Sequence, residues 1–127
     1  MTSTELKQRT KKFAIRVIEF VDNLPKRKKF DVIAYQILRS STSIGANYRA
    51  ACRARSKAEF LAKLGIVEEE ADETIYWLEL IKEILGKNND KIQNEELDLL
   101  LKEADELTAI FTKAAKTMKM QIRNAKS

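Results

Sequence analysis

Cationic side chains form two groups in the first half of the sequence. The first is the run within PKRKK and the second follows a stretch rich in Ser and Ala; together they are Lys26, Arg27, Lys28, Lys29, Arg49, Arg53 and Arg55. Each phosphate that a cation neutralises releases counterions, so such groups bind nucleic-acid backbones with a strong salt dependence. Arginines also bind carboxylates through paired hydrogen bonds. The two groups are therefore candidate sites for RNA or DNA, although an acidic helix fits the arginines equally well and a solubilising loop explains the PKRKK run.

An acidic run near the middle of the chain contains Glu69 and Glu73, one helical turn apart. Facing carboxylates inside a bundle can hold two metal ions, but that pattern pairs Glu with a His three residues on, and this chain has no His. We therefore predict no metal site and expect salt bridges to basic residues. Tyr76 and Trp77 lie at the edge of an apolar stripe, where large aromatics often anchor interfaces. The predicted oligomer interface comprises Glu69, Glu73, Tyr76 and Trp77.

Several features argue against an enzyme. The absence of His removes the commonest general base, and the sequence has no Gly-rich phosphate loop, CxxC pair or nucleophile elbow. The single Cys52 excludes a disulfide within the chain and fits a reducing compartment. No apolar run approaches the roughly 20 residues that a membrane span needs. We predict a cytoplasmic non-enzyme with no catalytic residue, no cofactor, no small-molecule substrate and no membrane association.

The net charge of +5 is distributed unevenly along the chain. Residues 1–57 carry 14 Lys and Arg against 4 Asp and Glu, residues 58–111 carry 5 against 15, and residues 112–127 carry 5 cations and no acid. This segregation predicts complementary surfaces, either between helices or between subunits, or charged faces that are only solvated. On the first helix we expect the row Arg9, Lys12 and Arg16 to be partly neutralised by Glu5 and Glu19. The cations of the final turns suit the helix dipole, with nucleic-acid contact as a second alternative.

Apolar residues recur at steps of three and four along most of the chain, which predicts helices. Pro25 and Gly86 act as stops, whereas Thr2, Ser56 and Asn94 occupy capping positions. Four stripes of similar width joined by short connections predict one all-α domain over residues 1–127, an antiparallel up-down-up-down four-helix bundle. The expected helices are 4–24, 30–53, 57–86 and 94–123.

The second helix has an unusual stripe of small residues, Ser40, Ser41, Thr42, Ser43, Gly45 and Ala46. Small residues let another helix approach closely, and their hydroxyl groups can bond to carbonyls one turn back. Glycine within a helix costs about 1 kcal/mol relative to Ala. We therefore expect Gly45 to be placed at a close helix crossing.

Three segments, RSSTSIGANYR (39–49), RSKAEFLAKL (55–64) and EADETIYWLELI (70–81), carry a family resemblance. They closely resemble the bacterial four-helix-bundle proteins encoded by intervening sequences of 23S ribosomal RNA genes, and the resemblance covers nearly the whole chain. It implies a small bundle that assembles into a homopentamer and associates with nucleic acid. This chain has Ala50 where family members often carry Glu, so no role that depends on that acid is transferred.

Two functions follow as alternatives. The first is a basic homo-oligomer that binds the RNA or DNA backbone without sequence preference, since no helix-turn-helix or stacking platform is evident. The second is a protein-interaction scaffold, in which the cations pair with the acidic segment of a neighbouring subunit. A related bundle family, the accessory proteins of diversity-generating retroelements, suggests a basic pentamer that assists a reverse transcriptase.

Overall fold

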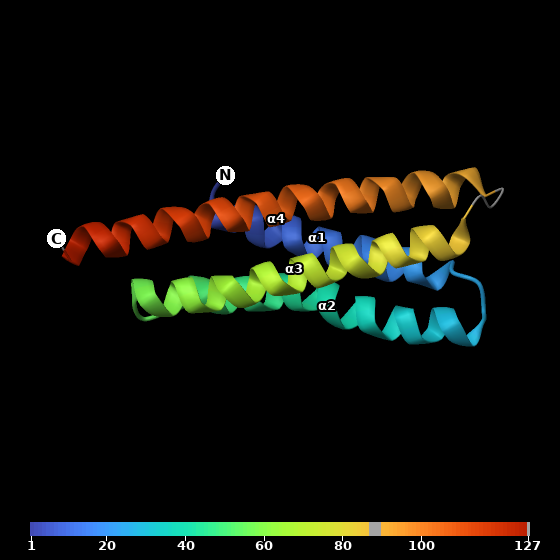
Figure 1. Ribbon diagram of the computed structural model, residues 1–127, viewed down its shortest axis with the longest axis horizontal. Coiled ribbons are helices and arrows are strands. Elements are labelled where there is room, and N and C mark those ends of the chain that lie inside the picture. The colour runs from blue at the N-terminus through green and yellow to red at the C-terminus, as the bar shows by residue number, and fades with distance from the viewer. Residues whose placement is uncertain (87–89, 127) are drawn as a thin grey trace.

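The computed structural model describes residues 1–86 and 90–126, and four helices account for most of them. Consecutive helices run antiparallel, and each packs against its two neighbours in the bundle, with α1 closing against α4 (Figure 1). The predicted all-α, up-down-up-down four-helix bundle is therefore confirmed. The helices are α1 Ser3–Asp22, α2 Lys28–Cys52, α3 Lys57–Leu85 and α4 Lys91–Lys126.

The predicted caps of α1 and α3 are confirmed. The Thr2 hydroxyl accepts a hydrogen bond from the backbone N–H of Glu5 at 3.1 Å, and the Ser56 hydroxyl accepts one from Glu59 at 3.0 Å. Each bond satisfies an N–H that the helix itself leaves without a partner. Helix α3 ends at Gly86, whose φ of 58° is accessible to glycine at little cost.

The helix boundaries differ from the predictions by up to three residues, and two of the shifted starts change how the sequence is interpreted. Helix α4 begins at Lys91, where the Asp90 carboxylate accepts the N–H of Gln93 at 2.9 Å, so Asn94 lies inside the helix and does not cap it. Helix α2 begins at Lys28, so the last two cations of PKRKK belong to its first turn. Only residues 23–27 connect α1 to α2. Most of the predicted loop at 87–91 lies outside the described residues.

The bundle core consists of the predicted apolar stripes. A short polar contact crosses this core, because the Thr74 hydroxyl lies 2.9 Å from the Ser40 hydroxyl and donates within its own helix to Glu70 O at 2.8 Å. Bonding of hydroxyls to preceding carbonyls is thus confirmed for the small-residue stripe, although the buried Ser41 hydroxyl has no partner within residues 1–86 and 90–126. The largest fully buried side chains include Phe13, Val17, Ile37, Ile44, Leu64, Leu78, Leu107 and Phe111.

The predicted close crossing at Gly45 occurs between α1 and α2. A Cβ atom added to Gly45 would lie 3.1 Å from the hydroxyl oxygen of Thr10 and 3.4 Å from its Cβ. Thr10 is fully buried, and its hydroxyl turns back to the carbonyls of Leu6 and Lys7, each at 3.0 Å. Because Gly45 has no side chain, α1 can lie against α2 at this point.

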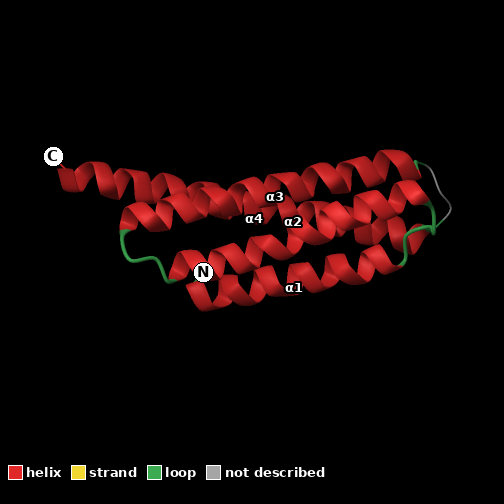
Figure 2. Cartoon of the chain, turned by 90° about the horizontal axis from the view of Figure 1, so that it is seen from below, coloured by secondary structure: helices red, strands yellow, loops and turns green. Residues whose placement is uncertain are grey.

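The two ends of the bundle differ in their connections (Figures 1 and 2). The α2–α3 turn forms one end, while the α1–α2 connection, the C-terminus of α3 and the N-terminus of α4 lie at the other. Helix α4, with 36 residues, is the longest helix, and its C-terminal turns extend beyond the α2–α3 turn. This overhang decides which charged residues come together.

Candidate functional site

The seven candidate nucleic-acid-binding cations lie at opposite ends of the bundle. Residues 26–29 lie at the end that carries the α1–α2 connection, whereas Arg49, Arg53 and Arg55 lie at the α2–α3 turn. Helix α2 separates them with its 25 residues, a length of about 37 Å at the helical rise of about 1.5 Å per residue. The two groups that the sequence indicated therefore form two separate surfaces.

Arginines of α1 bind carboxylates of α4. Arg9 donates to both carboxylate oxygens of Glu103, at 2.8 Å from Nε and 2.6 Å from Nη2, and Nη2 also donates to Glu106 at 3.0 Å. Arg16 lies 3.4 Å from Glu96. Neutralisation by Glu5 and Glu19 was the wrong expectation, because both arginines point sideways toward α4.

The Arg9–Glu103 pair is partly withdrawn from water. The side chain of Arg9 is 27% exposed and that of Glu103 is 16% exposed. The hydrogen bonds from Arg9 hold the pKa of Glu103 below its ordinary value, against the opposing effect of burial. The same hydrogen bonds raise the pKa of Arg9. This ion pair therefore fixes α1 against α4.

Arg39 performs the equivalent role between α2 and α3. Its guanidinium pairs with Glu73 and lies 3.5 Å from Glu70. The expectation that Glu73 would face a basic residue is thus confirmed, with a partner in the same chain. Glu69 is exposed and forms no ion pair with any residue in the described ranges.

The arginines at the α2–α3 turn have no such partners. Arg49, Arg53 and Arg55 are exposed, and none forms an ion pair within residues 1–86 and 90–126. Their backbones form local contacts: the N–H of Arg53 donates to the Ala50 carbonyl at 3.1 Å, and the N–H of Arg55 donates to the Glu59 carboxylate at 3.3 Å. These three guanidinium groups are therefore available to anions in solution.

Further cations lie at the same end. The overhang of α4 brings its last turns to the start of α3, where a shallow hollow of about 310 Å³ is lined by Leu61, Ile122 and three cations. Sequence reasoning assigned these α4 cations mainly to the helix dipole. The antiparallel order and the length of the last helix are the signals that would have placed them beside the turn. The cations are Lys119, Arg123 and Lys126.

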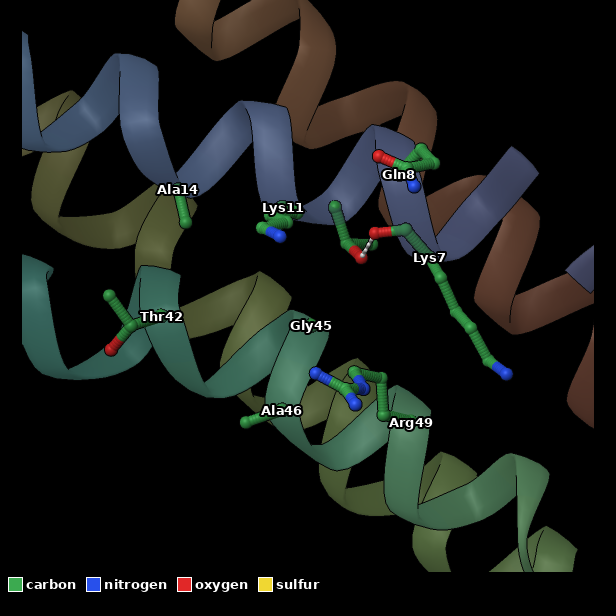
Figure 3. A pocket seen from close by; sticks show the side chains of 9 residues that line it. Lys7, Gln8, Lys11, Ala14, Thr42, Gly45, Ala46 and Arg49 are labelled. Atoms are coloured by element: carbon green, nitrogen blue, oxygen red, sulfur yellow. Dashed lines mark hydrogen bonds between the residues drawn. The ribbon is translucent and has the colours of Figure 1, made fainter. Parts of the chain in front are cut away.

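A groove between α1 and α2 joins this basic end to the body of the bundle (Figure 3). It has a volume of about 490 Å³, and Lys7 and Lys11 on α1 lie across it from Arg49 on α2. Small residues, including Thr42, Gly45 and Ala46, line the α2 side, and no acid lines the groove. Sequence reasoning missed Lys7 and Lys11, although their spacing of four residues placed them on one helix face.

The two predicted interface aromatics have different environments. Tyr76 is 55% exposed, whereas Trp77 is half-buried and packs against the core. The rings meet edge to face, with centroids 4.9 Å apart. The indole N–H of Trp77 is buried and has no hydrogen-bond partner among the residues that the structure describes. Tyr76 is therefore the aromatic side chain that a partner can reach.

In the described part of the chain, no three or more Asp, Glu and Cys side chains gather as metal ligands would. No helix in that part combines the length and apolar character that a bilayer crossing demands.

Comparison with known proteins identifies the family. The sequence model of the 23S rRNA-intervening sequence proteins matches residues 2–113. The chain belongs to this family. A solved structure from Bacteroides thetaiotaomicron, described as a protein of unknown function from the S23 ribosomal protein family, is 34% identical. The alignment covers 91% of this chain and 99% of that protein, with a TM-score of 0.78. No curated protein matches the chain significantly.

Proposed function

We propose that this family member is a non-enzymatic homo-oligomer that binds the phosphate backbone of RNA or DNA at its α2–α3 end. The observation that carries the proposal is the contrast among its arginines. Arg9, Arg16 and Arg39 are paired with carboxylates, whereas Arg49, Arg53 and Arg55 have none in the part of the chain that is described. Unpaired guanidinium groups suit phosphate oxygens, which accept paired hydrogen bonds.

The shape of this end supports binding to a backbone rather than to bases. The cations come from three elements, namely α2, the α2–α3 turn and the overhanging turns of α4, so they form one broad basic surface. Such a surface contacts phosphates and carries little sequence information. We therefore expect similar affinities for different sequences of the same length and strandedness.

Binding to RNA and DNA across a salt series tests the proposal. The purified protein is titrated with single- and double-stranded RNA and DNA, and its mass in solution is measured in parallel. In the triple variant Arg49→Ala, Arg53→Ala, Arg55→Ala, the slope of log K against log salt should fall by about one unit for each arginine that contacts a phosphate. The variant should keep the wild-type mass.

The opposite end supplies a matched control. Replacing Lys26, Arg27 and Lys28 with Ala removes the same number of cations, also exposed, at the α1–α2 end. If binding resides at the α2–α3 end, this control loses less affinity than the arginine variant. Absence of binding at low salt would overturn the proposal, and an equal loss in both variants would contradict the assignment to one end.

A second function, the protein-interaction scaffold, is favoured by the exposed face of α3. Glu69 and Tyr76 are exposed there, and Glu69 has no ion pair among the described residues. In this alternative the acids bind a neighbouring subunit, and the family resemblance suggests a homopentamer or a retroelement accessory role. If the arginine variant dissociates in the mass measurement, the arginines belong to the subunit interface and the scaffold is the better description.

A further inference from the structure

Two exposed faces of this bundle have complementary chemistry. One is the α1–α2 groove with the cations Lys7 and Lys11 on its α1 side, which we call the groove face. The other is the outward side of α3, which we call the α3 face. Its residues recur at steps of three or four and so form one stripe along the helix. They are Ile66, Glu69, Glu73, Tyr76, Leu80 and Glu83.

The groove face continues from a basic half into an apolar half. A second hollow of about 550 Å³ shares Thr42 with the groove and is lined by Ile18, Tyr35 and Leu38, together with Arg39. Tyr35 is 69% exposed and Ile18 is 41% exposed, which is unusual for such large side chains on one continuous strip. The strip therefore offers cations at one end and apolar surface at the other.

The α3 face carries the matching groups. Ile66 is 44% exposed and Tyr76 is 55% exposed, and acids lie between and beyond them. Glu69 and Glu83 are exposed and form no ion pair within the described ranges. An acidic helix with an exposed aromatic thus faces solvent on the same molecule that displays a basic, partly apolar groove.

The geometry of the groove suits a helix. Thr42, Gly45 and Ala46 line the α2 side of the groove with small side chains, so a third helix can approach α2 closely there. One chain cannot fill its own groove in this way, because α3 contacts α2 and α4 but not α1. The occupant must come from outside the chain.

We infer that the groove face of one copy binds the α3 face of a second copy. This inference rests on the self-association included in the proposed function, and it assigns that contact to two different surfaces. When two copies join through unlike surfaces, one groove face and one α3 face remain unoccupied. A closed assembly that fills every face is therefore a ring. Opposite charges across the contact fix the direction in which each copy is added.

Charge reversal on each face tests the inference. Lys7→Glu with Lys11→Glu makes the groove face acidic, and Glu69→Lys with Glu83→Lys makes the α3 face basic. Each reversal alone places like charges opposite each other, so we expect the mass in solution to fall to that of a single chain. The chain that carries all four substitutions has opposite charges again, and its assembly should return.

A matched control separates the contact from general charge effects. Lys102→Glu with Asp105→Lys changes two exposed residues of α4 that form no ion pair in the described part of the chain. This variant should assemble like the wild type. Circular dichroism checks that every variant is folded, and the milder pair Lys11→Gln and Glu69→Gln replaces any variant that does not fold. In that pair each single change should weaken assembly.

The outcomes separate this inference from the proposed function. A wild-type protein that is monomeric at every concentration removes both the self-association and this contact. Assembly that persists in both single-face variants, or a folded four-substitution chain that stays monomeric, overturns the contact alone. Arg49, Arg53 and Arg55 are unchanged in all these variants. If the wild-type protein assembles but does not bind nucleic acid, that result contradicts only the nucleic-acid binding in the proposed function.

Discussion

Arginines occur both in the body of the bundle and at its α2–α3 end, and their surroundings differ. In the body, Arg9 and Arg39 each bind two carboxylates of a neighbouring helix. At the end, Arg53 and Arg55 are exposed and have no ion pair in the described ranges. Arginine side chains therefore orient neighbouring helices in the body of the bundle and remain available to a ligand at its α2–α3 end.

The order of charges along the chain explains the difference. The antiparallel path lays the acidic residues 58–111 beside the basic helices α1 and α2 through most of the bundle. Residues 112–127 then carry five cations and no acid, and they extend past the α2–α3 turn. Along the body, acidic residues therefore lie beside the cations of α1 and α2. At the α2–α3 end, the last turns of α4 add positive charge instead.

The largest effect on stability should come from the packed body. Phe111 is fully buried and lies against Tyr48, with ring centroids 5.6 Å apart. We expect Phe111→Ala to lower the free energy of unfolding by about 3–5 kcal/mol, through lost burial and the cavity left behind. Urea unfolding measures this. Arg53→Ala at the end should change the same free energy by less than about 0.5 kcal/mol. Similar losses in the two variants would break the distinction between body and end.

Removal of the Arg9 ion pair should have the next largest effect. Arg9→Ala leaves Glu103 half-buried without its bidentate partner, and we expect a loss of about 1.5–3 kcal/mol in the free energy of unfolding. The double variant with Glu103→Gln should lose less than the sum of the single variants, because the unpaired charge is gone. Additive losses would show that the two side chains act independently, contrary to the structure.

The same pair predicts a pH dependence in the body that the end lacks. The pKa of Glu103 is lower in the folded chain than its ordinary value of 4.5, so its contribution is fully present above that value. This contribution is lost as the pH falls below 4.5 through the pKa of the folded state. Thermal unfolding between pH 6 and about pH 3 should therefore show a smaller loss for Arg9→Ala than for the wild type. Arg53→Ala should follow the wild type, and a flattened profile in that variant would contradict the comparison.

Most of the fold follows from local sequence signals, whereas the partners of the charged residues do not. Capping residues and apolar periodicity are properties of neighbouring positions, so Thr2, Ser56 and Gly86 act where predicted. The pairing of Arg9 with Glu103 joins residues 94 positions apart and depends on the register of α1 against α4. Several acids of α4 compete for that role in the sequence, and only packing selects among them.

The candidate site shows the same division. The sequence identified Arg49, Arg53 and Arg55 and, as a second group, residues 26–29, but it assigned neither group to an end of the bundle. The antiparallel order alone would have separated the two groups, since consecutive connections alternate between ends. The groove lined by Lys7 and Lys11 was harder to predict, because its opening depends on how closely α1 approaches α2.

The smallest effect tests the α1–α2 crossing that supports this groove. Gly65 on α3 has no atom within 4 Å of an added Cβ, so Gly65→Ala should stabilise the bundle by about 1 kcal/mol through helix propensity. Gly45→Ala gains the same propensity, but its Cβ meets the Thr10 hydroxyl at 3.1 Å, and we expect the gain to be cancelled. In a Thr10→Ala background, where that oxygen is absent, Gly45→Ala should stabilise by about 1 kcal/mol again. Urea unfolding of the wild type, the two single variants and the double variant measures the coupling between Gly45 and Thr10 in the free energy of unfolding. A full gain from Gly45→Ala in the wild-type background would mean that the crossing tolerates a side chain, and the close approach of α1 would then need another cause.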